Sequence, residues 1–344
     1  MTDPLVARLA PRVYSEIARH LIGTPTYDWI RSGSGDDFGS DNEAAFGRRR
    51  LRPSVLVDVS TVSTATTVLG ATIAAPVMIG PMGLQRAVHP DGELAMARGA
   101  AGAGSLLIVA VNATTSVEDI AAAAPDLPLW FQLYNWDDRD ALARVIARAE
   151  AAGCRAIVPL VNTARDVNHT SPQIGFRLPA GARFAHFETS PGLTGANTWE
   201  YLSWLRSVTK LPIVPKGIMT ADDAARAVDA GAAAIIVSNH GGRQLERSIS
   251  TLDALADVVA GGAGVEVYLD GGVRTGGDIL VALALGARAV LIGRPAMWGL
   301  AVGGAEGVAR VLDTLRQELA DDAGLCGLPD VTAVPRGVVV DSAG

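Results

Sequence analysis

The sequence has very little cysteine and no long apolar run. Of its 344 residues only two are cysteines, Cys154 and Cys326, and neither lies in a CxxC pair. Two distant thiols give neither a disulfide framework nor a zinc site, so we expect no metal and a reducing compartment. The longest apolar stretches, such as SLLIVAV at 105–111, are too short to cross a bilayer, so no membrane partner is expected.

Positive charge is also in short supply. Lys and Arg number 29 against 36 Asp and Glu, which gives a net charge of -7 and argues against a nucleic-acid partner. The one dense basic run, at 48–52, is expected to be a solvated loop. Residues 1–23 are of mixed charge and lack the apolar core of a signal peptide, which predicts a cytoplasmic protein. Their apolar residues have helical spacing, at Val6, Leu9, Val13, Ile17 and Leu21.

From residue 76 onward, short apolar runs alternate with Ala-rich helical stretches. Runs that are apolar throughout are typical of parallel strands covered by helices on both faces. Eight such units predict a (β/α)8 TIM barrel. An open doubly wound sheet is the alternative, but no GxGxxG follows the first strand. The predicted strands are 76–81, 105–110, 129–134, 156–161, 212–217, 234–239, 265–270 and 289–293.

We predict a single domain, residues 1–344. It has an N-terminal helical lead-in at 1–75, the barrel at 76–323 and a tail at 324–344. The one long gap, 162–198, follows the fourth strand and is polar and rich in Gly and Pro. Such a loop is expected to be a lid or wall of the active site, or else disordered.

Active sites of such barrels lie at the carboxyl ends of the strands. The last two strands end in DGGVR and GRP, and their glycines and arginines predict a phosphate site. Either turn alone would be read as a tight turn, but two adjacent ones with an arginine each favour phosphate. The residues expected to hold the phosphate are Gly271, Gly272, Arg274, Gly293 and Arg294.

Polar side chains end three other strands. Lys216 is suited to pair with the electron-rich end of a reduced flavin, although a salt bridge to a carboxylate is the alternative. Gln132 and Ser238 are candidates to hydrogen-bond a ring system, or are structural. The segment SNHGGR places His240 three residues before Arg243. A base beside a carboxylate clamp suits oxidation of the carbon next to a carboxylate.

The chain resembles, over nearly its whole length, the FMN-dependent α-hydroxy acid dehydrogenase/oxidase family, which includes glycolate, lactate and mandelate oxidases. The matching stretches follow one another in the family's order. They are YDWIRSGSGDD…N (27–42), LRPSVLVDVS (51–60), HPDGELAMARGA (89–100), WFQLY (130–134), LPIVPKGI (211–218), SNHGGRQL (238–245), LDGGVRTGGD (269–278) and IGRP (292–295).

The resemblance implies FMN as cofactor and His240 as catalytic base, with Arg243 and Tyr134 binding substrate. It also implies a homo-oligomer, a tetramer in relatives. The sequence shows no haem motif or membrane-insertion stretch, so oxygen or a soluble carrier is expected as electron acceptor rather than a quinone. The residues that it places around FMN are Pro81, Met82, Gly83, Ala110, Gln132, Lys216, Ser238, Asp270, Gly271, Gly272, Arg274, Gly293 and Arg294.

Several positions depart from the family. Trp29 stands where a substrate-binding tyrosine is usual, and His169 where a second carboxylate-binding arginine is usual. Asn162 replaces the aspartate that backs the base, which should weaken the base. Ala110 and Leu160 replace a serine and a threonine that contact FMN. These changes point to a substrate larger than glycolate or lactate, aromatic or less charged, such as a biosynthetic intermediate.

Gly83 has two interpretations. A glycine there is expected either to leave about a methyl's volume beside the cofactor, which favours oxidative decarboxylation, or merely to allow close backbone approach.

The leading function is oxidation of a 2-hydroxy acid, or of a related alcohol or amine, at the carbon beside a carboxylate. The alternatives are a non-redox flavin isomerase, a non-catalytic flavin-binding relative, and a barrel enzyme that binds a phosphorylated substrate without flavin.

Overall fold

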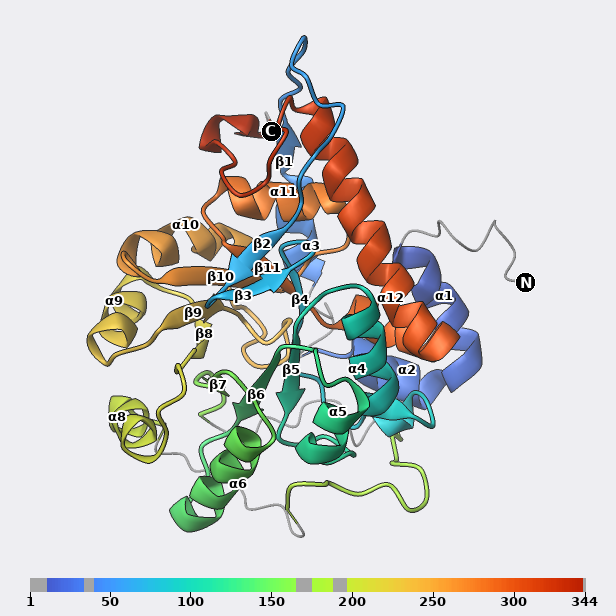
Figure 1. Ribbon diagram of the computed structural model, residues 1–344, viewed down its shortest axis with the longest axis vertical. Coiled ribbons are helices and arrows are strands. Elements are labelled where there is room, and N and C mark those ends of the chain that lie inside the picture. Colours follow the sequence, from blue (N-terminus) through green and yellow to red (C-terminus); the bar gives the residue numbers. More distant parts are fainter. Residues whose placement is uncertain (1–10, 34–39, 165–174, 188–196, 343–344) are drawn as a thin grey trace.

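The computed structural model describes residues 11–33, 40–164, 175–187 and 197–342. Its centre is a parallel sheet with strand order β7-β6-β5-β4-β11-β10-β9-β8 (Figure 1). Parallel bridges between Ile157 and Ile213 and between Leu160 and Lys216 join the two ends of this sheet. The predicted (β/α)8 barrel is therefore confirmed. The strands are β4 Val77–Ile79, β5 Leu107–Ala110, β6 Leu129–Leu133, β7 Ile157–Pro159, β8 Lys216–Ile218, β9 Ala234–Val237, β10 Glu266–Asp270 and β11 Ala289–Ile292.

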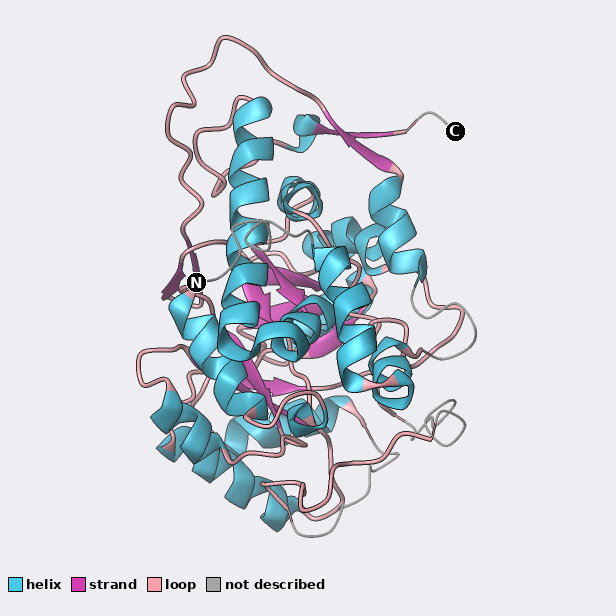
Figure 2. Cartoon of the chain, turned by 90° about the vertical axis from the view of Figure 1, so that its right-hand side faces the viewer, coloured by secondary structure: helices cyan, strands magenta, loops and turns pink. Residues whose placement is uncertain are grey.

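A helix follows each barrel strand, and the helices surround the strands (Figure 2). Many begin where a Ser, Thr or Asp side chain accepts the backbone N–H three residues on, as Ser250 does from Asp253. The helices are α4 Gly92–Gly102, α5 Val117–Ala123, α6 Arg139–Ala151, α8 Trp199–Val208, α9 Ala221–Asp229, α10 Thr251–Gly261, α11 Gly276–Ala284 and α12 Arg294–Leu325.

The strands are apolar on both faces because the barrel has two cores. Alternate residues, such as Met78 and Trp130, fill the interior of the barrel. Their neighbours, such as Ile79 and Phe131, pack outward against the helices. The hairpin of β2 Thr66–Val68 and β3 Ala71–Ile73 joins the inner core through Val68, Ala71 and Ile73. One end of the barrel is thus plugged, which leaves the carboxyl ends of the strands for a site.

The lead-in segment forms α1 Pro11–Ile22, α2 Thr24–Arg31 and α3 Ser40–Gly47. The helical spacing of residues 1–23 corresponds to α1, in which Tyr14 and Ala18 are buried and Leu21 is 58% exposed. Val6 and Leu9 lie outside the described residues. We find no helix in the described ranges that is both long and apolar enough to span a membrane.

The basic run at 48–52 is not a solvated loop, as the sequence suggested. Its residues form β1 Arg49–Leu51, which pairs antiparallel with β12 Val339–Asp341 of the C-terminal tail. Arg49 bridges Asp253 and Asp341, both at 3.0 Å. Strand pairing and ion pairs therefore join the lead-in to the tail, a long-range contact that charge patterning alone does not reveal. The predicted division into lead-in, barrel and tail stays a prediction, and α12 runs to Leu325, two residues past the predicted end of the barrel.

Candidate active site

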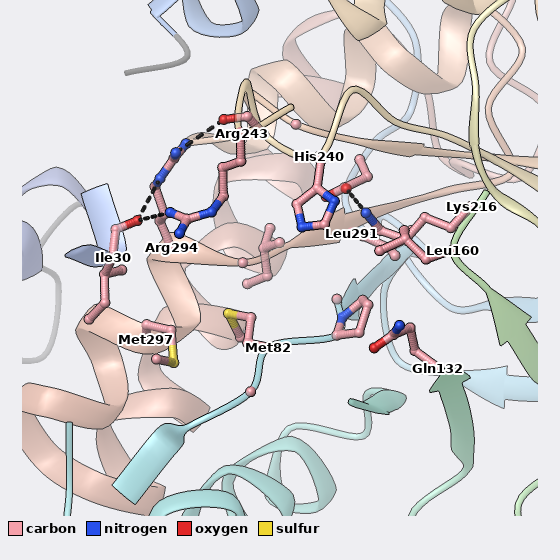
Figure 3. A pocket seen from close by; sticks show the side chains of 18 of the residues that line it. Ile30, Met82, Gln132, Leu160, Lys216, His240, Arg243, Leu291, Arg294 and Met297 are labelled. Carbon is pink, nitrogen blue, oxygen red and sulfur yellow. Dashed lines mark hydrogen bonds and ion pairs between the residues drawn. The ribbon is translucent and has the colours of Figure 1, made fainter. Parts of the chain in front are cut away.

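A pocket lies at the carboxyl ends of the barrel strands, under the C-terminal end of α2. Gln132 and Lys216 lie at one end of it and Arg243 and Arg294 at the other, with His240 between them (Figure 3). Most residues predicted for the site meet here: Trp29, Pro81, Met82, Gly83, Gln132, Tyr134, Lys216, His240, Arg243, Asp270, Gly271, Gly272, Arg274, Gly293 and Arg294.

Three predicted residues are not placed in the pocket wall. Ala110 is buried in β5 and does not line the pocket. Ser238 is buried behind Lys216, and its hydroxyl is shared among protein groups rather than turned to the pocket. His169 lies outside the described residues. Leu160, which replaces a cofactor-binding threonine in the resembling family, does line the pocket, as an apolar surface.

Lys216, Ser238 and Asp270 form a buried polar triangle. The Lys216 Nζ lies 2.6 Å from Asp270 Oδ2 and 2.8 Å from Ser238 Oγ, which donates to the same carboxylate oxygen at 2.6 Å. Burial would raise the pKa of Asp270, but Lys216 and the hydrogen bonds hold it below its usual value. The salt bridge considered as an alternative for Lys216 therefore exists. It positions the ammonium, which still lines the pocket.

His240 is held in an unusual backbone conformation beside this triangle. Its φ is 60°, in the left-handed region, and its N–H donates to Ser238 Oγ at 3.0 Å. Burial, followed by the charges of Lys216 and Arg243, lowers the pKa of His240 to about 3. The ring is therefore neutral at physiological pH, the form in which an imidazole accepts a proton. Its buried Nδ1 has no partner among the described residues.

Asn162 lies close to the base through the backbone. Its Nδ2 donates to the Ser238 carbonyl at 3.1 Å, while its buried Oδ1 has no partner within the described ranges. A carboxamide stabilises a neighbouring imidazolium less than a carboxylate does, because it carries no charge.

We expect Asn162→Asp to raise the pKa of His240, because a nearby carboxylate favours the protonated ring. Substrate oxidation needs the neutral ring, so its rate falls as the pH drops through that pKa. This acidic limb should move to higher pH by about one unit or more in the variant. Stopped-flow pH profiles of flavin reduction measure it, and superimposable profiles for wild type and variant would remove Asn162 from the support of the base.

Arg243 is anchored by the end of a helix. Its Nη1 donates to the carbonyls of Trp29, Ile30 and Ser32 at 3.0, 3.3 and 2.8 Å. These are C-terminal carbonyls of α2, where the helix dipole favours a cation. Its Nε and Nη2 have no hydrogen-bond partner in the part of the chain that the structure describes. One edge of the guanidinium is thus fixed and the other is available for a carboxylate.

The end of the pocket that holds Arg243 and Arg294 is strongly cationic. Arg294 donates to the carbonyls of Ile30, Arg31, Ser32 and Gly241, and Arg274 pairs with Glu43 at 2.8 Å. Burial, with the charges of Arg274 and Arg243, lowers the pKa of Arg294 to about 9. These cations lie beside the N-terminus of α12, which has no side-chain cap. An anion here would relieve the repulsion, as the sequence predicted for a phosphate.

A glycine at the cationic end of the pocket, Gly272, is also required by the packing of the protein. A Cβ on Gly272 would lie 2.5 Å from the Asn42 carbonyl oxygen, and φ is 86°. The approach of α3 therefore requires glycine at this position with or without a ligand. The phosphate assignment rests on the cations and the open helix end instead.

The pocket fits FMN on its donors. The buried Gln132 Nε2 has no partner among the described residues, which is costly unless a ligand accepts from it. Lys216 and Gln132 would hold the polar edge of the ring, and the cationic end beside α12 would hold the phosphate. A hydrogen-bonding edge and an anion site at opposite ends of one pocket match a flavin mononucleotide.

The expected free space beside Gly83 is not there. A Cβ on Gly83 would lie 2.5 Å from Asn112 Cγ and 2.8 Å from Nδ2, and closer still to Oδ1. The carboxamide of Asn112 fills the volume that a methyl group would take, so close approach explains the glycine. Asn112 lines the pocket and was missed from the sequence, because only the folded loops bring it over Gly83.

Trp29 lines the pocket near Arg243 and is backed by a second aromatic residue, Phe176. The Trp29 ring stacks on Phe176 with centroids 4.2 Å apart and planes at 9°, and the Arg243 guanidinium carbon lies 5.7 Å from its centroid. Phe176 belongs to the long loop after β7, which was predicted to wall the site. His186 fixes the later part of this loop, where its Nδ1 contacts the Val111 carbonyl at 2.8 Å and its Nε2 accepts from Val117 N–H at 3.0 Å.

Comparisons with known proteins agree with this geometry. The family model of FMN-dependent dehydrogenases matches residues 18–341. The chain belongs to this family. It is 43% identical to L-lactate oxidase from Nostoc sp. over 89% of this chain and 91% of that protein. It is 42% identical to human 2-hydroxyacid oxidase 2 over 94% and 95%. A mandelate oxidase crystal structure superposes with a TM-score of 0.91 at 39% identity, over 97% and 98%.

Family membership confirms two expectations from the sequence. The cofactor is FMN, and the chain is an oxidoreductase that acts at a carbon–hydroxyl group. Family membership alone does not identify the substrate or the roles of individual residues.

Proposed function

We propose that this chain oxidises a 2-hydroxy acid with an aromatic side chain, with His240 as the base. The observation that carries the proposal is the stacked pair of Trp29 and Phe176 beside Arg243. An indole in contact with the carboxylate-binding arginine adds apolar surface and has no hydroxyl to hold a small, polar acid. The similarity to mandelate oxidase supports the same substrate class.

Each residue has a role in this scheme. The outward edge of Arg243 binds the substrate carboxylate. His240, neutral at physiological pH, takes the proton of the C2 hydroxyl group as C2 is oxidised to a ketone. Bound FMN supplies the acceptor for the hydrogen on C2 together with its two electrons. Tyr134 lines the pocket and is assigned to substrate binding. Oxygen or a soluble carrier as final acceptor, a homo-oligomer and a cytoplasmic location remain parts of the proposal.

The competing functions are less well supported. A non-redox isomerase does not agree with the family model of dehydrogenases or with the oxidases that the chain resembles. A non-catalytic flavin-binding protein would not keep His240, Arg243 and Lys216 in one pocket. A barrel that binds phosphate without flavin is excluded by the family. Oxidative decarboxylation loses its argument from Gly83, because Asn112 occupies the space.

We expect mandelate to reduce the bound flavin under anaerobic conditions with kcat/KM at least about tenfold above glycolate and L-lactate, because the Trp29 ring gives the aryl group an apolar surface that the small acids cannot use. Bleaching of the flavin absorbance in stopped flow measures this. The double variant Trp29→Tyr, His169→Arg should raise kcat/KM for the small acids about tenfold. Equal rates for all three acids in wild type would contradict the aromatic substrate. No bleaching with any 2-hydroxy acid would contradict the activity.

A further inference from the structure

His240 lies in a turn whose backbone conformation is unfavourable. Residues 240–242 all have positive φ, at 60°, 65° and 76°, and His240 is the one of the three that carries a Cβ. Such a conformation persists only where the surrounding structure holds it. Asn239 supplies part of that support, because its Oδ1 accepts the Gly242 N–H at 3.2 Å and closes the turn.

Asn239 is held in turn by Asn42 of α3. The two carboxamides exchange hydrogen bonds, because Asn42 Nδ2 donates to Asn239 Oδ1 at 2.8 Å and Asn239 Nδ2 donates to Asn42 Oδ1 at 2.9 Å. Both side chains are buried, and a buried amide is costly unless its oxygen and its nitrogen are paired. Each residue must offer a donor and an acceptor, which an amide does and a carboxylate does not.

A second branch leads from Asn42 to the phosphate end of the pocket. Asn42 Oδ1 also accepts the N–H of Thr251, the buried first residue of α10, at 3.1 Å. The Thr251 hydroxyl donates to the Gly271 carbonyl at 3.4 Å. The backbone of Asn42 packs on the same turn, since a Cβ on Gly272 would lie 2.5 Å from the Asn42 carbonyl oxygen.

The neighbour of Asn42 contacts the phosphate end as well. Glu43 pairs with Arg274, one of the cations expected to bind the phosphate, at 2.8 Å. One turn of α3 therefore contacts both the cationic end of the pocket and the turn that carries His240. Asn42 lies at the junction, with one hydrogen-bonded branch to each.

We propose that Asn42 is a positioning residue that joins the phosphate end of the FMN site to the turn that carries His240. Residues 271–272 are steadied when the phosphate binds there, and Asn42 passes this restraint to Asn239, so the placement of the base depends on the bound cofactor. Linkage makes the dependence mutual. The inference rests on the proposed function for the role of His240. It follows from the buried network of Asn239, Asn42, Thr251 and Gly271.

Three variants of similar shape separate the two branches. Asn239→Leu cuts the branch to the base, Thr251→Val cuts the branch to the phosphate end, and Asn42→Leu cuts both. Asn239→Leu should slow flavin reduction by mandelate about tenfold and weaken FMN binding much less. Thr251→Val should mainly weaken FMN binding, by about fivefold, and Asn42→Leu should show both losses, each about tenfold.

Two measurements on the holoenzyme give these losses. The rise of flavin fluorescence on dilution reports the affinity for FMN, and anaerobic stopped flow with saturating FMN and mandelate gives the rate of reduction. The double variant Asn42→Leu, Asn239→Leu should reduce the flavin no more slowly than Asn42→Leu alone, because both substitutions break the same pair of hydrogen bonds.

Ser250→Ala is the matched control for a loss of stability alone. Ser250 caps α10 beside Thr251 and does not line the pocket. The variant should lower the melting temperature and leave both measurements unchanged.

The proposal is overturned by any of three results. These are a wild-type rate of reduction in Asn42→Leu, additive losses of rate in the double variant, and losses in Ser250→Ala as large as those in Asn42→Leu. If no 2-hydroxy acid bleaches the flavin of wild type, the proposed function fails. The release of FMN then decides for Asn42, because faster release from Asn42→Leu than from Ser250→Ala supports its place at the phosphate end and equal release contradicts it.

Discussion

Replacing His240 by alanine is expected to slow flavin reduction by mandelate about a thousandfold while FMN stays bound. A positioned general base contributes roughly 10²–10⁴ to a rate, and a methyl group cannot accept a proton. The cofactor should remain because its proposed contacts, Gln132, Lys216 and the cationic end beside α12, are untouched. His240 is also the group whose pKa is lowered to about 3, so the wild-type ring is in its basic form at neutral pH.

Anaerobic stopped flow and the flavin-to-protein ratio of each purified protein provide the measurement. His20→Ala is the matched control, because His20 is exposed in α1 and does not line the pocket, so its replacement should leave reduction unchanged. Added imidazole should restore part of the lost rate in His240→Ala by replacing the missing base. Near wild-type reduction in that variant would show that His240 is structural. Loss of FMN would show that the ring positions the cofactor instead.

Much of the barrel could be predicted because each strand is recognisable from a short stretch of sequence. Each strand must be apolar on both faces, since one face meets the inner core around Met78 and the other meets the helices. Strand limits were less accurate. Lys216 was expected at the end of its strand but begins β8, and the residues before it join their neighbours only through the isolated bridge of Ile213 with Ile157 and single backbone hydrogen bonds.

The sequence predicted the pocket residues that follow directly from the end of one strand. It missed the contacts that form between loops from different strands. His240 and Arg243 follow one strand, so their common placement was visible in SNHGGR. Asn112 and Gly83 follow different strands, and their contact exists only once the two loops are folded. The anchoring of Arg243 by α2 is also hidden, because backbone carbonyls of any sequence could accept those bonds. Of these contacts, only the glycine at 83 gave a signal, and it was interpreted either as free space or as close backbone approach.

The anchored guanidinium leads to the second large expected effect, in Arg243→Met. We expect the preference of the enzyme for mandelate over its carboxamide, mandelamide, to be about a hundredfold in wild type and to fall to within a few-fold in the variant. Two charge-assisted hydrogen bonds to the carboxylate are lost, each of about 1.5–3 kcal/mol, and the acid gains no other partner. Rates of anaerobic flavin reduction with the two ligands give the preference.

The acid must be compared with the amide because Arg243 also stabilises the structure of the protein. Its Nη1 binds three carbonyls at the end of α2, so its removal also loosens the helix that carries Trp29. That loss affects acid and amide alike and cancels in their ratio. Arg243→Lys should lie between wild type and Arg243→Met, because an ammonium keeps the charge but cannot hold α2 and the substrate with separate edges. If Arg243→Met still prefers the acid over the amide, another cation binds the substrate carboxylate. The next candidate is Arg294, which hydrogen-bonds to the Gly241 carbonyl.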